Sequence, residues 1–383
     1  MRPADLSLVR SFAHARHNEA LELLRKLVRI PAPSLDEGRR ASFVRSWMHD
    51  NGMSAAHVDE ATNVICPIRD DGHCDLVVFA AHLDVVFPDT SELPLREEAG
   101  RLYAPGVGDD TANLVALLMA TRELSAHPEL LPEGLGVLVV ADSGEEGLGN
   151  LRGTRQLFAA YGPRIRRFYS FDLYLPQCIS TAVGSYRWEI AVRTQGGHSF
   201  GDYGRPNAIE RLCSIIQELY ALGLPQDATC TMNVGTIEGG TGVNAIASEA
   251  KALFEYRSTS DKALETLERR LREVIERFVT PEVSVKVTSR GVRPASADVS
   301  DDRLRQLTEA SCDVIRSVTG EQPDQSPAST DANIPLSLGV PANTIGAVRG
   351  ALLHTRNEWV NAASVEEGLA VVMGIMLAQR DLG

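Results

Sequence analysis

GVLVVADSGEEGLGN, residues 136–150, sets a continuous apolar run directly before two adjacent acids, Glu145 and Glu146. The run has the length of a strand and does not alternate apolar with polar residues, which is typical of a strand buried on both faces of an α/β sheet. The glycines around the two acids permit unusual backbone conformations and close approach. Because buried carboxylates repel each other and lose hydration, the stretch predicts a positively charged partner at this point.

A second buried strand is predicted from DLVVFAAHLD, residues 75–84, and TANLVALLMATREL, residues 111–124, predicts a helix between the two strands. A further helix is predicted over residues 16–30, where the prolines of IPAPS end it. Strands that alternate with helices indicate an α/β fold with a mainly parallel sheet flanked by helices.

The pattern changes after residue 184. Six segments then predict the order strand, helix, strand, strand, helix, strand: residues 187–194, 207–222, 229–239, 249–258, 263–278 and 283–289. This βαββαβ order is that of a ferredoxin-like α+β domain. We therefore expect a small domain at residues 184–292, inserted into an α/β domain made of residues 1–183 and 293–383.

Composition limits the function classes. A chain of 383 residues suits two domains, and its net charge of -13 disfavours nucleic acid and anionic membranes as partners. No apolar run approaches the roughly 20 residues of a membrane helix, and we expect no secretory signal. The six cysteines are scattered without a C-x-x-C pair, so we interpret them as reduced thiols of a cytoplasmic protein.

Residues of the kind that bind metals follow the predicted strands, where the functional groups of parallel sheets gather. Five segments contribute the candidates His82 with Asp84, Asp109 with Asp110, Glu145 with Glu146, Asp172, and His354. Taken singly, each has an ordinary explanation as a loop histidine, a helix cap or a solvated turn. Taken together they predict a metal site, because a divalent ion offsets the cost of burying so many carboxylates.

The chain also resembles the M20 family of metallopeptidases, which includes carboxypeptidases, tripeptide aminopeptidases, dipeptidases and N-acyl amino acid deacylases. The resemblance covers nearly the whole chain and is carried by eight motifs in order: AHLDVV, APGVGDDTAN, SGEEGLGNLRG, SFDLY, GGHSFGDYG, GGTGVNAIA, FEYRS and HTRNEWV. It implies a di-metal hydrolase domain with an inserted lid or dimerisation domain.

This resemblance implies the metal ligands. Asp109 would bridge two divalent ions, with His82 and Asp172 on one and Glu146 and His354 on the other. One imidazole with carboxylates suits zinc, with cobalt or manganese as alternatives. The peptide bond between Asp109 and Asp110 is expected to be cis.

The resemblance assigns further roles around the metals. Asp84 would hold the His82 ring, and Glu145 would act as the general base on a metal-bridging water. His198 would stabilise the oxyanion, reaching over from the partner subunit of a homodimer. Asn244, Arg257 and Arg293 are the candidate substrate-binding residues, and a surface ion pair is the alternative for both arginines.

Three positions depart from the family pattern. Pro105 stands where an arginine is usual, Thr111 where a lysine is usual and Ala81 where a glycine is usual. None is a ligand position, so the predicted metal centre is kept, but these departures weaken any transfer of substrate specificity from the family.

Three hypotheses for the function follow. The first is a metal-dependent exopeptidase that cleaves an amide bond in short peptides. The second is an amidohydrolase that deacylates an N-acyl amino acid or another small amide at the same centre. The third is a non-catalytic binding protein that keeps the fold, which the full set of ligands and the base disfavours.

Overall fold

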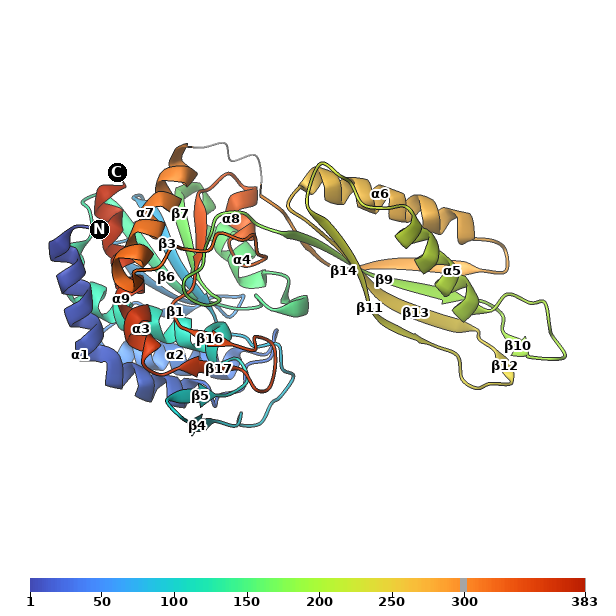
Figure 1. The fold of residues 1–383 in the computed structure, drawn as a ribbon, viewed down its shortest axis with the longest axis horizontal. Coiled ribbons are helices and arrows are strands. Elements are labelled where there is room, and N and C mark those ends of the chain that lie inside the picture. The colour runs from blue at the N-terminus through green and yellow to red at the C-terminus, as the bar shows by residue number, and fades with distance from the viewer. Residues whose placement is uncertain (297–301, 383) are drawn as a thin grey trace. The chain divides into compact units, whose positions relative to one another are not determined.

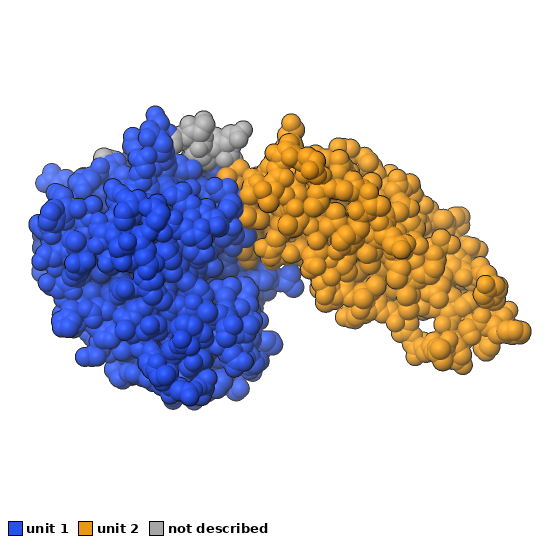
Figure 2. All heavy atoms as spheres, viewed as in Figure 1, with its two compact units in different colours: residues 1–182, 298–383 blue, residues 183–297 orange. Residues whose placement is uncertain are grey.

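The computed structural model describes residues 1–296 and 302–382. The chain divides into two compact units, one made of residues 1–182 and 298–383 and the other of residues 183–297 (Figures 1 and 2). The sequence predicted the insertion at residues 184–292. Residues 297–301, which fall in the predicted second part of the larger domain, lie outside the described residues.

The first unit contains a seven-stranded sheet of order β1-β2-β6-β3-β7-β15-β8. Its strands are β1 (His57–Val58), β2 (Val64–Ile68), β3 (Asp75–His82), β6 (Leu135–Asp142), β7 (Ile165–Phe171), β8 (Cys178–Ile179) and β15 (Ala342–Ile345). The neighbours β6, β3, β7 and β15 run parallel, whereas β2 and β8 join the sheet antiparallel. The predicted α/β fold with a mainly parallel sheet is confirmed.

Helices cover both faces of this sheet. They are α1 (Pro3–Leu27), α2 (Gly38–Asp50), α3 (Asn113–Ala126), α4 (Arg152–Tyr161), α7 (Asp302–Thr319), α8 (Asn333–Ser337) and α9 (Ser364–Leu377). Alternate residues of β3 enter two separate cores. Val77 and Phe79 belong to the core that includes α1, α3, α7 and α9, whereas Leu76 and Val78 belong to the core with α4 and α8. Burial on both faces explains why β3 and β6 are continuously apolar.

Helix α1 begins at Pro3, so the prediction of a helix that starts at residue 16 was wrong at this end. The first half of α1 carries charged residues, but Val9, Phe12 and Ala13 are buried, and the helix contacts α9. The tertiary contact with α9 supplies an apolar environment that the local sequence does not reveal.

A second, smaller sheet of the same unit was not predicted. It has the order β16-β17-β5-β4 and consists of β4 (Arg96–Glu98), β5 (Arg101–Tyr103), β16 (Gly350–Ala351) and β17 (Trp359–Asn361). Strands of two or three residues are too short to show a periodic pattern. The guanidinium of Arg101 stacks 3.9 Å from the centre of the Trp359 ring across this sheet. The sheet matters for function because His354 lies between β16 and β17.

The second unit is a four-stranded antiparallel sheet with two helices. Its elements are β9 (Gly184–Arg193), α5 (Ala208–Ala221), β11 (Cys230–Gly239), β13 (Glu249–Ser258), α6 (Asp261–Phe278) and β14 (Ser284–Arg293). The spatial order β11-β13-β9-β14 is that of a ferredoxin-like fold. Asn207 and Ser260 cap α5 and α6 by accepting backbone N–H groups on their side-chain oxygens. The unit also contains a short antiparallel pair of strands, β10 (Gly197–His198) and β12 (Ala245–Ile246). In the chain, β10 follows β9 and β12 follows β11.

In the part of the chain that the structure describes, none of the helices combines the length and the apolar character needed to cross a membrane.

Candidate metal centre

The carboxyl ends of the parallel strands bring the candidate ligands to one edge of the large sheet. His82 ends β3, the acids Glu145 and Glu146 follow β6, and Asp172 follows β7. Strand β3 lies between β6 and β7, so these three segments are neighbours. Asp109 comes from the turn after β5, and His354 from the loop between β16 and β17.

One group of possible ligands contains His82, Asp109 and Asp172. The His82 Nε2 atom lies 2.9 Å from Asp109 Oδ1 and 4.0 Å from Asp172 Oδ1. All three side chains are buried. One nitrogen and two carboxylate oxygens within 4.8 Å of one another form a group whose spacing and chemistry suit a divalent ion.

A second group contains Asp109, Glu146 and His354. The His354 Nε2 atom lies 3.0 Å from Asp109 Oδ2 and 3.0 Å from Glu146 Oε1. Asp109 thus presents Oδ1 to the first group and Oδ2 to the second. The residues present fit two divalent ions that share one carboxylate, because each group offers one imidazole and two carboxylates.

The pKa values in the metal-free chain report how crowded these charges are. Burial, followed by the charge of Asp109, raises the pKa of Glu146 to about 8, and the same two causes raise the pKa of Asp172 well above its usual value. Hydrogen bonds to Asp109 and Glu146 raise the pKa of His354 to about 10. Protons on Glu146 and His354 therefore offset part of the negative charge of this cluster, which is the task that a bound cation would take over.

Burial also shifts the pKa values of Asp109 and His82, but nearby charges and hydrogen bonds outweigh its effect on both groups. Burial by itself would raise the pKa of Asp109, yet the hydrogen bonds from His354 and His82 bring it below its usual value. For His82, burial would lower the pKa, but the charge of Asp110 and the contact with Asp109 raise it well above its usual value.

Asp84 fixes the backbone of the acid pair. Its Oδ1 accepts the N–H of Glu145 and its Oδ2 accepts the N–H of Glu146, both at 3.0 Å. The expected contact with the ring is made differently: His82 Nδ1 lies 3.0 Å from the backbone oxygen of Asp84 and 3.6 Å from its carboxylate. The Asp84 carboxylate is therefore committed chiefly to the segment that carries Glu145 and Glu146.

Asp110 supports the same centre from the other side. The peptide bond between Asp109 and Asp110 is cis. The Asp110 carboxylate accepts the backbone N–H of His82 at 2.8 Å and the side-chain amide of Asn113 at 2.7 Å. It accordingly holds the backbone of the candidate ligand His82 in place, while its neighbour Asp109 faces the two groups of possible ligands.

The fully buried Arg40 lies close enough to Asp84 and Asp110 to interact with their charges. Its guanidinium donates to the carbonyl oxygens of Ile30 and Leu83 and reaches the Thr111 hydroxyl at 3.4 Å. Burial lowers the pKa of Arg40 to about 10, and the charges of Asp84 and Asp110 oppose this shift. Arg40 was not among the residues predicted from the sequence, because an arginine in an amphipathic helix is usually exposed.

Two further candidates, His198 and Asn244, meet within the second unit. His198 pairs with Ala245 between β10 and β12, and the N–H of Ser199 donates to the backbone oxygen of Asn244 at 3.0 Å. The His198 side chain is exposed, and its Nδ1 accepts the N–H of Gly201 at 3.2 Å. The Nδ1 atom is thus used by the loop itself.

The arginine candidates share one face of the sheet of the second unit. Arg257 on β13 and Arg293 on β14 both pair with Ser185 on the central strand β9. Arg187 and Glu255 form the next pair on the same face, two residues further along, and Glu255 accepts from Arg257 at 2.9 Å and from Arg187 at 3.4 Å. Arg293 is only 4% exposed, so the alternative of a surface ion pair is wrong for this residue.

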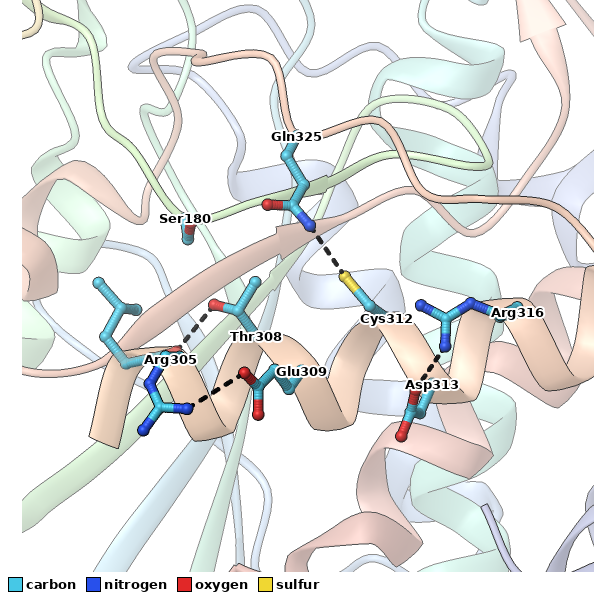
Figure 3. A pocket seen from close by; sticks show the side chains of 9 residues that line it. Ser180, Arg305, Thr308, Glu309, Cys312, Asp313, Arg316 and Gln325 are labelled. Atoms are coloured by element: carbon cyan, nitrogen blue, oxygen red, sulfur yellow. Dashed lines mark hydrogen bonds and ion pairs between the residues drawn. The ribbon is translucent and has the colours of Figure 1, made fainter. Parts of the chain in front are cut away.

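Other polar features of the first unit do not belong to this centre. A cavity of about 490 Å³ along α7 contains none of the candidate ligands (Figure 3). Its lining includes Cys312, whose sulfur accepts the side-chain amide of Gln325 at 3.4 Å. An acidic turn at Asp70 and Asp71 is explained by local hydrogen bonds to backbone N–H groups and by the ion pair of Asp70 with Arg164.

Comparisons with known proteins agree with this geometry. The succinyl-diaminopimelate desuccinylase of Bordetella parapertussis is 28% identical over 280 residues, which cover 67% of this chain and 72% of that protein. The crystal structure of a tripeptidase from Staphylococcus aureus superposes with a TM-score of 0.75 at 20% identity and covers 95% of this chain and 99% of its own.

A third relative is the YXEP protein of Bacillus subtilis, described as a dinuclear metal binding peptidase from the M20 family. It superposes with a TM-score of 0.66 at 14% identity and covers 97% of this chain and 100% of its own. Residues 78–378 match peptidase family M20/M25/M40, and this range includes every candidate ligand. The chain is a metal-dependent hydrolase that belongs to peptidase family M20/M25/M40.

Proposed function

We propose that the protein hydrolyses an amide bond in a short peptide, acting as an exopeptidase with two divalent ions, most simply zinc, with cobalt or manganese as alternatives. The single observation that carries this proposal is the position of Asp109, whose two carboxylate oxygens face two different imidazoles at 2.9 and 3.0 Å. A shared carboxylate of this kind suits two adjacent ions. When bound, such a pair polarises the scissile carbonyl and lowers the pKa of the attacking water.

Glu145 is the proposed general base. It is buried next to Glu146, its backbone N–H is fixed by Asp84, and it belongs to a group of possible ligand atoms with His82 and Glu146. In the proposed reaction, Glu145 takes a proton from the attacking water and delivers it to the nitrogen of the leaving amine. Glu146 holds a metal, so the two adjacent acids divide two tasks between them.

The inserted unit supplies the groups that contact the substrate. We propose that His198 donates a hydrogen bond to the oxyanion and that Asn244 binds the substrate next to it. Arg257, with Arg293 and Arg187 on the same sheet face, offers guanidinium groups to a substrate carboxylate. Glu255 neutralises part of this charge, since it accepts hydrogen bonds from both Arg257 and Arg187. We further propose a homodimer in which His198 serves the metal centre of the partner subunit.

A deacylase is the second candidate. The relative that is 28% identical is a desuccinylase, which removes a succinyl group from succinyl-diaminopimelate, whereas the tripeptidase at 20% identity resembles this chain in fold alone. A peptide and an N-acyl amino acid both present an amide next to a carboxylate. The residues of the candidate metal centre therefore suit both substrate classes. We propose that the residues around Arg257 determine which of the two the protein prefers.

A substrate panel tests the proposal. Purified protein is loaded with zinc, cobalt or manganese and offered dipeptides, tripeptides, N-acetyl amino acids and N-succinyl amino acids. We expect hydrolysis of a dipeptide or tripeptide at a kcat/KM at least tenfold above that of the acylated amino acids. The reverse order would replace the peptidase by the deacylase, and no hydrolysis of any amide with all three metals would refute both.

A further inference from the structure

Glu358 is a buried acid that neither the proposed chemistry nor the ligand set uses. It lies in HTRNEWV, four residues after the ligand candidate His354, and is 1% exposed. A buried carboxylate is costly unless hydrogen bonds satisfy it. The structure provides four of them, and all four donors lie in segments that carry candidate metal ligands.

Three of the donors are backbone N–H groups of the turn that carries Asp109. Oε2 of Glu358 accepts from Gly106 at 2.8 Å, and Oε1 accepts from Gly108 at 2.9 Å and from Asp109 at 2.8 Å. Such a close approach requires Gly108, because a Cβ atom there would lie 2.9 Å from Glu358 Oε1 and 2.4 Å from the Tyr174 ring. The turn is therefore wrapped around the carboxylate.

The fourth donor belongs to the segment that carries Asp172. The hydroxyl of Tyr174, two residues after Asp172, donates to Glu358 Oε1 at 2.8 Å. Glu358 itself stands at the end of the loop that carries His354, and its backbone oxygen accepts the N–H of Ala104 at 3.1 Å. One carboxylate thus joins the segments of Asp109, Asp172 and His354.

We propose that Glu358 is a positioning residue that fixes these three ligand-bearing segments to one another before any metal binds. Preformed ligands lose less conformational entropy when the metal arrives, so this connection raises metal affinity. The inference rests on the proposed metal centre for its consequence, but the connection itself is a property of the metal-free chain.

Three substitutions and a matched control separate the contributions of the four hydrogen bonds. Glu358→Ala removes all four acceptor contacts. Glu358→Gln keeps an oxygen for Gly108, Asp109 and Tyr174, but its amide nitrogen faces the N–H of Gly106, so three contacts remain. Tyr174→Phe removes the fourth contact alone, and Glu367→Ala is the matched control, since it removes a partly exposed acid that pairs with Arg349 outside the centre.

Hydrogen exchange of the metal-free protein, resolved to single amides, is the first measurement. We expect Glu358→Ala to accelerate exchange at Gly106, Gly108 and Asp109, Glu358→Gln to accelerate it at Gly106 alone, and the Glu367→Ala control to leave all three unchanged. If Glu358→Ala does not fold, Glu358→Gln and Tyr174→Phe carry the same test. Exchange at Gly106 in Glu358→Gln equal to that of the unchanged protein would overturn the proposal.

Zinc affinity, measured by competition with a chelating dye, is the second measurement. We expect Glu358→Ala to weaken zinc binding by about 10–100-fold and Glu358→Gln by less than about tenfold. Faster exchange with unchanged affinity would show that the connection does not position the ligands, and would overturn the proposal. Absence of zinc binding by the unchanged protein would instead refute the proposed function, and exchange alone would then decide whether Glu358 fixes the turn.

Discussion

The Nε2 atom of His354 lies 3.0 Å from Oε1 of Glu146, although the two residues are 208 positions apart in the chain. Glu146 follows a central strand of the large sheet, and His354 belongs to a loop of the small sheet. Both sheets lie in the first unit, so the candidate metal centre combines a segment that follows a strand of the large sheet with a loop of the small sheet.

The two adjacent glutamates are expected to respond differently to substitution. Glu145→Ala should reduce kcat by about 10²–10⁴-fold while the metal content stays near that of the unchanged protein, because the base is lost and the ligands remain. Glu146→Ala should lose or weaken one metal. Metal content by elemental analysis, together with kcat, checks both. Loss of metal in Glu145→Ala with full metal in Glu146→Ala would reverse the two roles.

Asp84→Asn should impair the centre without removing a ligand. The amide keeps one acceptor oxygen, but its nitrogen then faces one of the N–H groups of Glu145 and Glu146 that the carboxylate accepts at 3.0 Å. We expect zinc affinity to fall by about 10–100-fold, measured with a chelating dye. Ser34→Ala is the control, since it removes only the hydroxyl that donates to Asp84 Oδ2 at 2.6 Å. Equal affinities of Asp84→Asn and the control would contradict the positioning role of Asp84.

Metal affinity should rise with pH. In the metal-free protein the pKa of Glu146 is raised to about 8 and that of His354 to about 10, so both groups hold protons at pH 7. At a pH below the pKa of such a group, the metal must displace its proton in order to bind. Each proton released in this way contributes about a tenfold rise in metal affinity per pH unit.

Zinc titrations at pH 6, 7 and 8 check this dependence. The Glu146→Gln variant has no proton to lose at this position. The rise of its zinc affinity per pH unit should therefore be about tenfold smaller than that of the unchanged protein. Equal slopes for Glu146→Gln and the unchanged protein would show that Glu146 does not release a proton when metal binds.

Coexpression of two inactive variants tests whether His198 acts on the partner subunit. Glu145→Ala and His198→Ala should each be nearly inactive as homodimers. A mixed dimer has one site that lacks both groups and one site with Glu145 from one chain and His198 from the other. With random pairing about half of the dimers are mixed, so about a quarter of the original activity should return.

Differently tagged copies identify the mixed dimers in this experiment. Activity at the level of the single variants, in a sample where mixed dimers are isolated through both tags, would place the action of His198 within its own chain. A protein that stays monomeric by light scattering would exclude the proposed dimer.

The predicted fold could be read from the chain where the physical signal is local. The buried strands β3 and β6 are continuously apolar, and the helix between them has apolar residues throughout. The first half of α1 gave no such signal, because its apolar face is defined by α9, which lies at the other end of the chain. The strands of the small sheet are too short for any pattern to emerge.

The supporting residues were hidden for a related reason. Glu358 stands in the HTRNEWV motif, in which His354 is the residue with an evident chemical role, and its only local signal is an acid next to a short strand. Arg40 shares the buried face of α2 with Val44 and Met48, but an arginine at such a position gives no local sign of its partners. Hydrogen-bond partners in distant segments, such as Gly106 for Glu358 and Leu83 for Arg40, determine what these charged side chains do.

The sequence by itself determined the α/β class, the inserted βαββαβ unit and the identity of the candidate ligands. Apolar periodicity and metal-binding residue types at strand ends are local properties of the chain, so they can be recognised without knowing the tertiary contacts. Tertiary structure alone decided that Asp109 faces His82 and His354 with different oxygens, and that Asp84, Asp110 and Glu358 accept hydrogen bonds from the segments that carry the candidate ligands. These contacts join residues far apart in the chain, and their energy depends on burial that only the packed molecule creates.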